Sequence, residues 1–96
     1  MRYPYAKHNI NKSDIEAVTN VLKNQNLTQG NEVSKFEVDL ANYLDCEEVV
    51  VCANGTAALH LSYLSLGLAR GKGILTSPIT FLATANAAKM TGADVY

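Results

Sequence analysis

The sequence predicts an α/β fold built on a parallel sheet, and three observations lead to this prediction. Apolar residues recur at helical spacing in two segments of the first half. Short β-branched runs then alternate with helical segments of about three turns. The 96 residues are 48% hydrophobic and 18% charged, which favours a buried core over a disordered chain. Strands that alternate with helices indicate layers packed on a parallel sheet.

Two helices are predicted in the first half of the chain. The first spans about residues 14–23, because Ser13 and Glu16 form a capping-box pattern before an apolar helical repeat. The second spans about residues 32–44, where the apolar residues form one stripe. Between the two lies a loop, in which Gly30 is free to adopt a positive φ.

A buried parallel strand and a third helix follow. Residues 48–52 are a short β-branched run of the kind found in buried parallel strands. Asn54 is a good N-cap for a helix over about residues 56–66. Gly67 then suits the position just after the helix end, where a left-handed residue is common.

The last quarter of the chain predicts a strand, a helix and a further strand. Residues 74–77 form the strand, which Pro78 ends because proline donates no hydrogen bond. An alanine-rich helix spans about residues 81–90 and closes at Gly92. Residues 93–96 are the third strand.

Three short strands make a thin sheet for an α/β domain. No linker or domain boundary is visible within residues 1–96. We therefore expect one incomplete domain, the opening part of a longer protein.

Composition and charge exclude several classes of function. Eight Lys and Arg against nine Asp and Glu leave a net charge of -1, which gives no electrostatic footprint for nucleic acid or membrane. Cys46 and Cys52 are too few for a disulfide scaffold and lie in no metal-ligand cluster, so reduced thiols in a cytoplasmic protein are favoured. Residues 49–69 contain no Lys, Arg, Asp or Glu and are numerous enough to span a bilayer. Because Asn54-Gly55-Thr56 interrupts this stretch, we expect a buried strand and a buried helix instead of a membrane span.

The junction between the predicted strand and third helix is the best candidate binding site. The first N–H groups of a helix lack internal partners and carry the positive end of its dipole. Gly55 allows a ligand close to the backbone, and Thr56 adds a hydroxyl donor, so a phosphate cradle is plausible. An Asn-capped helix without a ligand explains the same residues. Neither a Walker loop nor a dinucleotide fingerprint is present.

Two further segments are candidates of the same kind. Phe81 follows a strand, at the sheet edge where α/β proteins bind ligands, so its face could cover a planar ring. An ordinary core position is the alternative. The polar loop 26–30 is equally well explained as a plain turn.

In this order, five segments resemble the N-terminal part of the DegT/DnrJ/EryC1/StrS family of sugar-nucleotide aminotransferases. The resemblance covers about residues 4–95, roughly the first quarter of a family-length protein. It is strongest for the branch of the pseudaminic acid pathway, which aminates a UDP-linked 4-keto-6-deoxy sugar. The segments are Leu27-Thr28-Gln29-Gly30, Phe36-Glu37, Asn54-Gly55-Thr56-Ala57-Ala58-Leu59, Thr76-Ser77-Pro78-Ile79-Thr80-Phe81-Leu82-Ala83-Thr84-Ala85-Asn86 and Gly92-Ala93.

The resemblance implies the large domain of a fold type I enzyme that depends on pyridoxal 5'-phosphate. Gly55, Thr56 and Ala57 would hold the cofactor phosphate, and Phe81 would stack on the pyridine ring. The family's catalytic lysine and the aspartate that pairs with the ring nitrogen lie beyond position 96. The resemblance therefore assigns no catalytic residue, and no metal, to this chain.

The resemblance also implies substrates and a partner. Thr28, Gln29 and Tyr5 would lie near the nucleotide sugar, glutamate would donate the amino group, and the family works as a homodimer. We expect that the chain alone is inactive and does not reach the family structure, because its strands lack their neighbours. The alternatives are an inert truncated or split-frame product and a small α/β module that binds a phosphorylated ligand.

Overall fold

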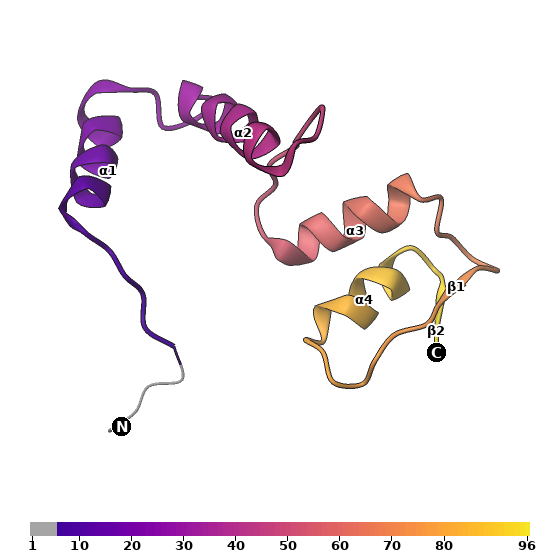
Figure 1. The fold of residues 1–96 in the computed structure, drawn as a ribbon. Helices are drawn as coiled ribbons and strands as arrows, with labels where there is room; N and C mark the ends of the chain where they lie inside the picture. The colour runs from indigo at the N-terminus through magenta and orange to yellow at the C-terminus, as the bar shows by residue number, and fades with distance from the viewer. Residues whose placement is uncertain (1–5) are drawn as a thin grey trace. The chain divides into compact units, whose positions relative to one another are not determined.

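The computed structural model describes residues 6–96, which fall into two compact units divided after Val49. Tyr5, a predicted substrate residue, lies outside the described residues. The first unit contains the helices α1 (Lys12–Asn24) and α2 (Asn31–Leu44), as Figure 1 shows. Both helices were expected from the apolar periodicity, and each extends one or two residues beyond its predicted bounds.

The cap of α1 differs from the prediction. Asn11, not Ser13, is the N-cap: its Oδ1 accepts from the backbone N–H of Asp14 at 3.2 Å. Asp14 Oδ2 accepts in turn from the backbone N–H of Asn11 at 2.9 Å, which completes a capping box. The Ser13 hydroxyl donates to the same Asn11 oxygen. Asparagine is at least as good an N-cap as serine. The capping box of Asn11 and Asp14 therefore starts α1 two residues before the predicted position.

The turn between α1 and α2 uses its glycine for space rather than for a positive φ. Gln29 adopts the left-handed conformation with φ 54°, whereas Gly30 has φ -78° and is the N-cap of α2. A Cβ at Gly30 would overlap the carbonyl oxygen of Asn26. The predicted positive φ at Gly30 was therefore wrong, and the glycine is required because the Asn26 backbone passes too close for a side chain.

Replacing Gly30 by alanine is expected to destabilise the first turn of α2. The added methyl overlaps a backbone atom that cannot rotate away, a type of overpacking that costs about 1–3 kcal/mol. Amide hydrogen exchange over the first turns of α2 measures the loss. The matched control is Gly55→Ala, since a Cβ there meets no heavy atom within 4 Å. Unchanged protection in Gly30→Ala would contradict the steric explanation.

The second unit is an α/β arrangement with a small parallel sheet. It contains α3 (Gly55–Ser65), β1 (Gly73–Ile74), α4 (Ala83–Met90) and β2 (Asp94–Val95). The two strands pair in parallel with Gly73 opposite Asp94. A bond of 2.9 Å from the Thr76 N–H to the Tyr96 carbonyl continues the pairing past the strand ends. The predicted parallel sheet and its order of elements are thus confirmed for these segments, but the first strand is Gly73–Ile74 rather than residues 74–77, and it ends before Pro78 is reached.

The predicted strand over residues 48–52 is not formed. These residues have no regular structure, and Val50 is 79% exposed. Within residues 6–96 the sheet consists of β1 and β2 alone. A β-strand is defined by its regular ladder to a neighbour about 4.8 Å away, and a β-branched composition alone does not supply one.

The end of α3 follows the prediction. Gly67 has φ 70°, and its N–H donates to the Leu64 carbonyl at 2.9 Å. The Leu68 N–H donates to the Tyr63 carbonyl at 2.9 Å, which completes a Schellman motif. Gly92 occupies the corresponding position after α4 with φ 83°. Both glycines were predicted to end their helices, Gly67 after the helix capped by Asn54 and Gly92 after the alanine-rich helix.

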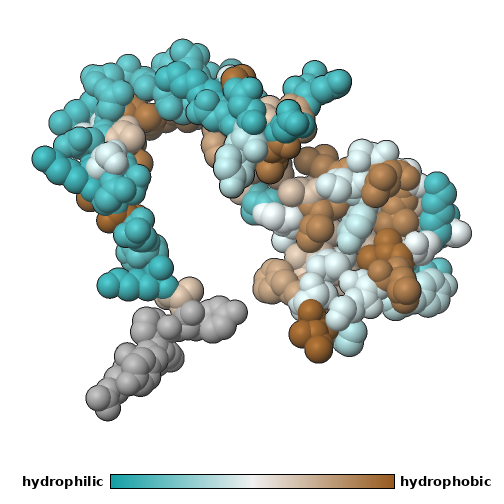
Figure 2. All heavy atoms as spheres, in the orientation of Figure 1, coloured by the Kyte–Doolittle hydropathy of each residue, from teal (hydrophilic) through white to brown (hydrophobic). Residues whose placement is uncertain are grey.

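The core of the second unit is formed by small side chains between α3, α4 and β2. Figure 1 shows α3 and α4 running in the same direction. The Tyr63 hydroxyl donates to the Thr84 carbonyl at 3.3 Å and links the two helices. Among the described residues the buried hydrophobic side chains are only alanines: Ala83, Ala87, Ala88 and Ala93. Large apolar side chains of this unit remain on the surface, as the brown atoms in Figure 2 show.

Candidate functional site

The start of α3 leaves two backbone donors available. Asn54 is extended, with φ -168° and ψ 170°, and its Oδ1 accepts from the Ala57 N–H at 2.9 Å. Its carbonyl accepts the first helical bond, from Ala58, at 3.0 Å. The N–H groups of Gly55 and Thr56 have no acceptor among residues 6–96. The predicted cap is confirmed, and it satisfies the third donor of the helix while the first two stay open.

The surroundings of these two donors favour an anion. The first turn of α3 contains no acidic residue, whereas the first turn of α1 contains Asp14 and that of α2 contains Glu32. Gly55 and Thr56 are exposed, and the space where a Gly55 side chain would lie is open. Apart from the Asn54 oxygen on the Ala57 N–H, no side chain of the described residues is hydrogen-bonded to this end of the helix, and no acidic residue of its first turn neutralises the positive end of the dipole.

Phe81 lies on the surface and not in the core. It is 80% exposed and lies between β1 and α4. It lines a mostly apolar pocket of about 350 Å³ at the carboxyl ends of the two strands. In Figure 1 the first turn of α3 and the segment that leads into α4 lie at the same end of the helix pair. Leu75 and Ile79, on the same segment, are exposed as well, at 87% and 93%.

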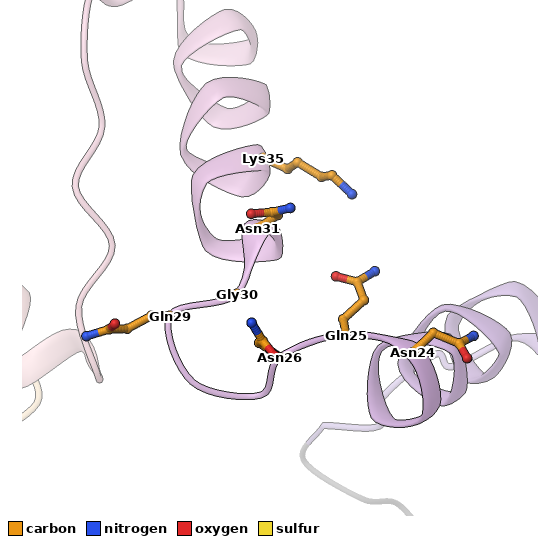
Figure 3. Close-up of a pocket in the computed structure, with 7 residues that line it drawn as sticks. All are labelled: Asn24, Gln25, Asn26, Gln29, Gly30, Asn31 and Lys35. Carbon is orange, nitrogen blue, oxygen red and sulfur yellow. The ribbon is translucent and has the colours of Figure 1, made fainter.

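A second, polar pocket of about 340 Å³ lies between the end of α1 and the start of α2 (Figure 3). Of the two predicted loop residues, Gln29 lines it and Thr28 does not. Figure 3 shows Gln25, Asn31 and Lys35 on one side of the loop and the Gln29 side chain extending from the other. Sequence reasoning missed these three residues, although the amide-rich run around the loop was a usable signal.

A charged pair borders this second pocket. Lys35 Nζ lies 2.7 Å from Glu32 Oε1, one helical turn apart on α2. The hydrogen bond from Lys35 lowers the pKa of the Glu32 carboxyl, and a hydrogen bond from Gln25 adds to the effect. Glu32 also places a negative charge in the first turn of α2, which disfavours a second anion there.

The Glu32 pair gives a pH-dependent prediction. Because the folded-state pKa is below the unfolded one, the pair stabilises α2 above the unfolded pKa, and this contribution is lost as the pH falls through the folded pKa. Lys35→Gln is expected to raise the NMR titration midpoint of the Glu32 carboxyl. Lys12→Gln, which removes the 3.6 Å pair with Glu16 on α1, is the control and should leave that midpoint unchanged. Equal midpoints in the wild type and Lys35→Gln would contradict the assignment.

The described part of the chain contains neither a metal-binding cluster nor a membrane-spanning helix. No group of three or more His, Cys, Asp or Glu side chains is arranged to hold a metal ion. None of the helices α1–α4 combines the length and apolar character needed to cross a bilayer.

Curated relatives carry sugar-related names. The chain is 46% identical over 91 residues to the UDP-4-amino-4,6-dideoxy-N-acetyl-beta-L-altrosamine transaminase of Campylobacter jejuni subsp. jejuni serotype O:23/36 (strain 81-176). It is 37% identical over 90 residues to the spore coat polysaccharide biosynthesis protein SpsC of Bacillus subtilis (strain 168). These matches cover 95% and 94% of this chain but only 24% and 23% of the relatives, so the chain spans about a quarter of their length.

Solved structures and a family model agree with these relatives. An aminotransferase from Psychrobacter cryohalolentis matches with a TM-score of 0.84 and 28% identity, over 96% of this chain and 24% of that one. A DegT DnrJ EryC1 StrS aminotransferase from Brucella abortus matches with a TM-score of 0.71 and 34% identity, over 84% and 22%. Residues 8–96 match the model of the DegT/DnrJ/EryC1/StrS aminotransferase family. The chain belongs to the DegT/DnrJ/EryC1/StrS aminotransferase family.

Proposed function

We propose that this chain is the N-terminal part of the major domain of a pyridoxal 5'-phosphate-dependent aminotransferase. The whole enzyme would move an amino group from glutamate to a nucleotide-linked 4-keto-6-deoxy sugar, in the cytoplasm and as a homodimer. Its product would enter surface polysaccharide or nonulosonic acid biosynthesis, such as that of pseudaminic acid. The names of a UDP-sugar transaminase and a polysaccharide biosynthesis protein among the relatives support this substrate class.

The residues at the start of α3 fit the phosphate of the cofactor. The open N–H groups of Gly55 and Thr56 would donate to phosphate oxygens, and the Thr56 hydroxyl would add a third bond. The N–H of Ala57 is not available to a phosphate, because it already donates to Asn54 Oδ1 at 2.9 Å. An anion that bound Ala57 would have to displace the Asn54 side chain. We therefore assign the direct contacts to Gly55 and Thr56, with Ala57 holding the cap in place.

Phe81 fits the ring of the same group. Its exposed face and the apolar pocket beside it offer a surface on which a planar heteroaromatic ring can stack. When bound, pyridoxal 5'-phosphate supplies the electron-withdrawing ring that amino transfer requires. The contribution of this chain is to bind the phosphate and to orient and cover the ring. None of its residues is assigned a proton-transfer step.

The nucleotide sugar is assigned to the other unit. Thr28 and Gln29, together with Tyr5, would lie near it, and the amide side chains of the second pocket suit the hydroxyl and carbonyl groups of such a ligand. The isolated chain is expected to transfer no amino group, because the family's lysine and aspartate are not among its 96 residues.

One observation carries this proposal. In a chain of this family, the backbone N–H groups of Gly55 and Thr56 have no acceptor among residues 6–96, and the first turn of α3 contains no acidic residue. Equilibrium dialysis with pyridoxal 5'-phosphate tests it. Thr56→Val removes the hydroxyl at nearly constant shape and should weaken binding by about 1 kcal/mol, roughly fivefold. Thr19→Val on α1 is the matched control, since Thr19 bonds only to the Ile15 carbonyl of its own helix. Equal affinities for all three proteins would refute the assigned phosphate site.

A further inference from the structure

The start of α3 combines two features that together favour a covalent change. The chain has nine asparagines, and Asn54 is the only one followed by glycine. It is exposed and lies outside the helix, in extended backbone. We propose that Asn54 is a self-modification site, at which the backbone nitrogen of Gly55 attacks the side-chain amide and converts residue 54 to aspartate or isoaspartate.

The nucleophile is less hindered here than after any other asparagine, because only Asn54 is followed by a glycine. Gly55 has no Cβ to block the approach of its nitrogen, and no heavy atom lies within 4 Å of where that Cβ would be. Its N–H has no acceptor among the described residues, so no protein hydrogen bond has to break before the nitrogen reacts. The positive end of the α3 dipole stabilises the negative charge that this nitrogen gains on losing its proton.

The electrophile is activated by the same helix. Asn54 Oδ1 accepts from the Ala57 N–H at 2.9 Å. As the Gly55 nitrogen adds to the Asn54 side-chain carbon, negative charge develops on this oxygen, and a fixed N–H donor stabilises it. The cap that starts α3 thus acts as a small oxyanion hole.

The step is balanced without an added oxidant or reductant. A bond forms between the Gly55 nitrogen and Asn54 Cγ, and the bond from Cγ to the side-chain nitrogen breaks. Ammonia leaves with the proton that the Gly55 nitrogen has lost, and a cyclic imide remains. Water then adds to one of the two imide carbonyls and opens the ring, giving aspartate or isoaspartate.

The product places a carboxylate directly in front of the two open N–H groups. This part of the inference rests on the proposed function, because the carboxylate would repel the cofactor phosphate from Gly55 and Thr56. Conversely, an anion that accepts a hydrogen bond from the Gly55 N–H holds this nitrogen in place and in its protonated form. The anion therefore slows the attack on the Asn54 side chain. Loading of the site would therefore protect the chain from its own modification.

Peptide mapping by mass spectrometry tests the modification. The full chain is incubated at mildly alkaline pH, and isoaspartate is detected independently with an isoaspartyl methyltransferase. Asn54 is expected to convert about tenfold faster than any of the other eight asparagines. Gly55→Ala, for which the structure has room, should slow the reaction at Asn54 about tenfold. Conversion of Asn54 at the rate of the others, or an unchanged rate in Gly55→Ala, would overturn the proposal.

A second arm tests the protection by an anion. Sulfate, compared with chloride at equal ionic strength, should slow the conversion of Asn54 in the wild type. An equal rate in both salts would overturn the protective coupling. Binding of pyridoxal 5'-phosphate is measured separately by dialysis. A failure of anions to protect Asn54 can therefore be distinguished from a failure of the proposed cofactor site.

Discussion

The 96-residue chain on its own is expected to give a helical circular dichroism spectrum but no sharp thermal transition. Its local signals for helix are strong, with a capping box on α1 and Asn54 on α3. Among residues 6–96 the buried side chains are alanines alone, and each buried methyl contributes only about 0.8 kcal/mol. Without a large side chain in the core, the helices have little that couples their unfolding.

The measurement is a temperature scan at 222 nm with a scan of the near-ultraviolet signal of the tyrosines. A gradual loss of helix without a near-ultraviolet transition is the expected result. A sigmoidal transition that coincides in both signals and does not depend on concentration would contradict it.

Asn54→Asp is expected to abolish most anion binding at α3 while it keeps the helix. Aspartate is as good an N-cap as asparagine, so the bond to the Ala57 N–H is retained. The new carboxylate lies in front of Gly55 and Thr56 and repels a phosphate by about 2 kcal/mol, roughly a thirtyfold loss of affinity. Dialysis with pyridoxal 5'-phosphate gives the affinity, and circular dichroism reports the helix.

Asn86→Asp is the matched control for this variant. Asn86 is exposed on α4, in the same unit, so the change in net charge is identical but lies away from the first turn of α3. Its affinity for the cofactor should stay within about twofold of the wild type, as expected for a screened surface charge. Equal losses in the two variants would show that net charge, and not the start of α3, governs binding.

The helices could be predicted because their signals are local. The cap residue Asn54, the alanine-rich run and the two glycines Gly67 and Gly92 located α3 and α4 to within a few residues. The start of α1 was misplaced because Asn11 and Ser13 both suit a cap, and the sequence does not rank them. The function of Gly30 depends on how close the Asn26 backbone passes, which no pattern of residues reveals.

The strand at residues 48–52 failed for a non-local reason. A β-branched run records a preference for a pleated, half-buried surface, but the strand exists only where a second strand pairs with it. β1 and β2 satisfy that condition through each other, with Ile74 opposite Val95. Residues 48–52 form no regular strand in the described part of the chain, and Val50 remains exposed.

The residues of the candidate site also fall into those that local sequence signals predict and those that depend on contacts in the folded chain. Gly55 and Thr56 could be found from the sequence, since a helix start with an Asn-Gly-Thr cap has a fixed local geometry. That Ala57 is engaged by the cap follows only from the 2.9 Å contact. Gln25, Asn31 and Lys35 approach one another through the bend between two helices, which periodicity does not determine.

The central claim is that the start of α3 binds an anion, and a ¹⁵N–¹H titration of the chain with inorganic phosphate tests it most directly. At low temperature, with helical Cα shifts over Gly55–Ser65 as the reference, the amides of Gly55 and Thr56 should shift in a saturable way. The start of α2 serves as the internal control, because Glu32 opposes an anion there. Saturable shifts at Asn31 and Glu32 with none at Gly55 and Thr56, or no saturable shift at all, would contradict the claim.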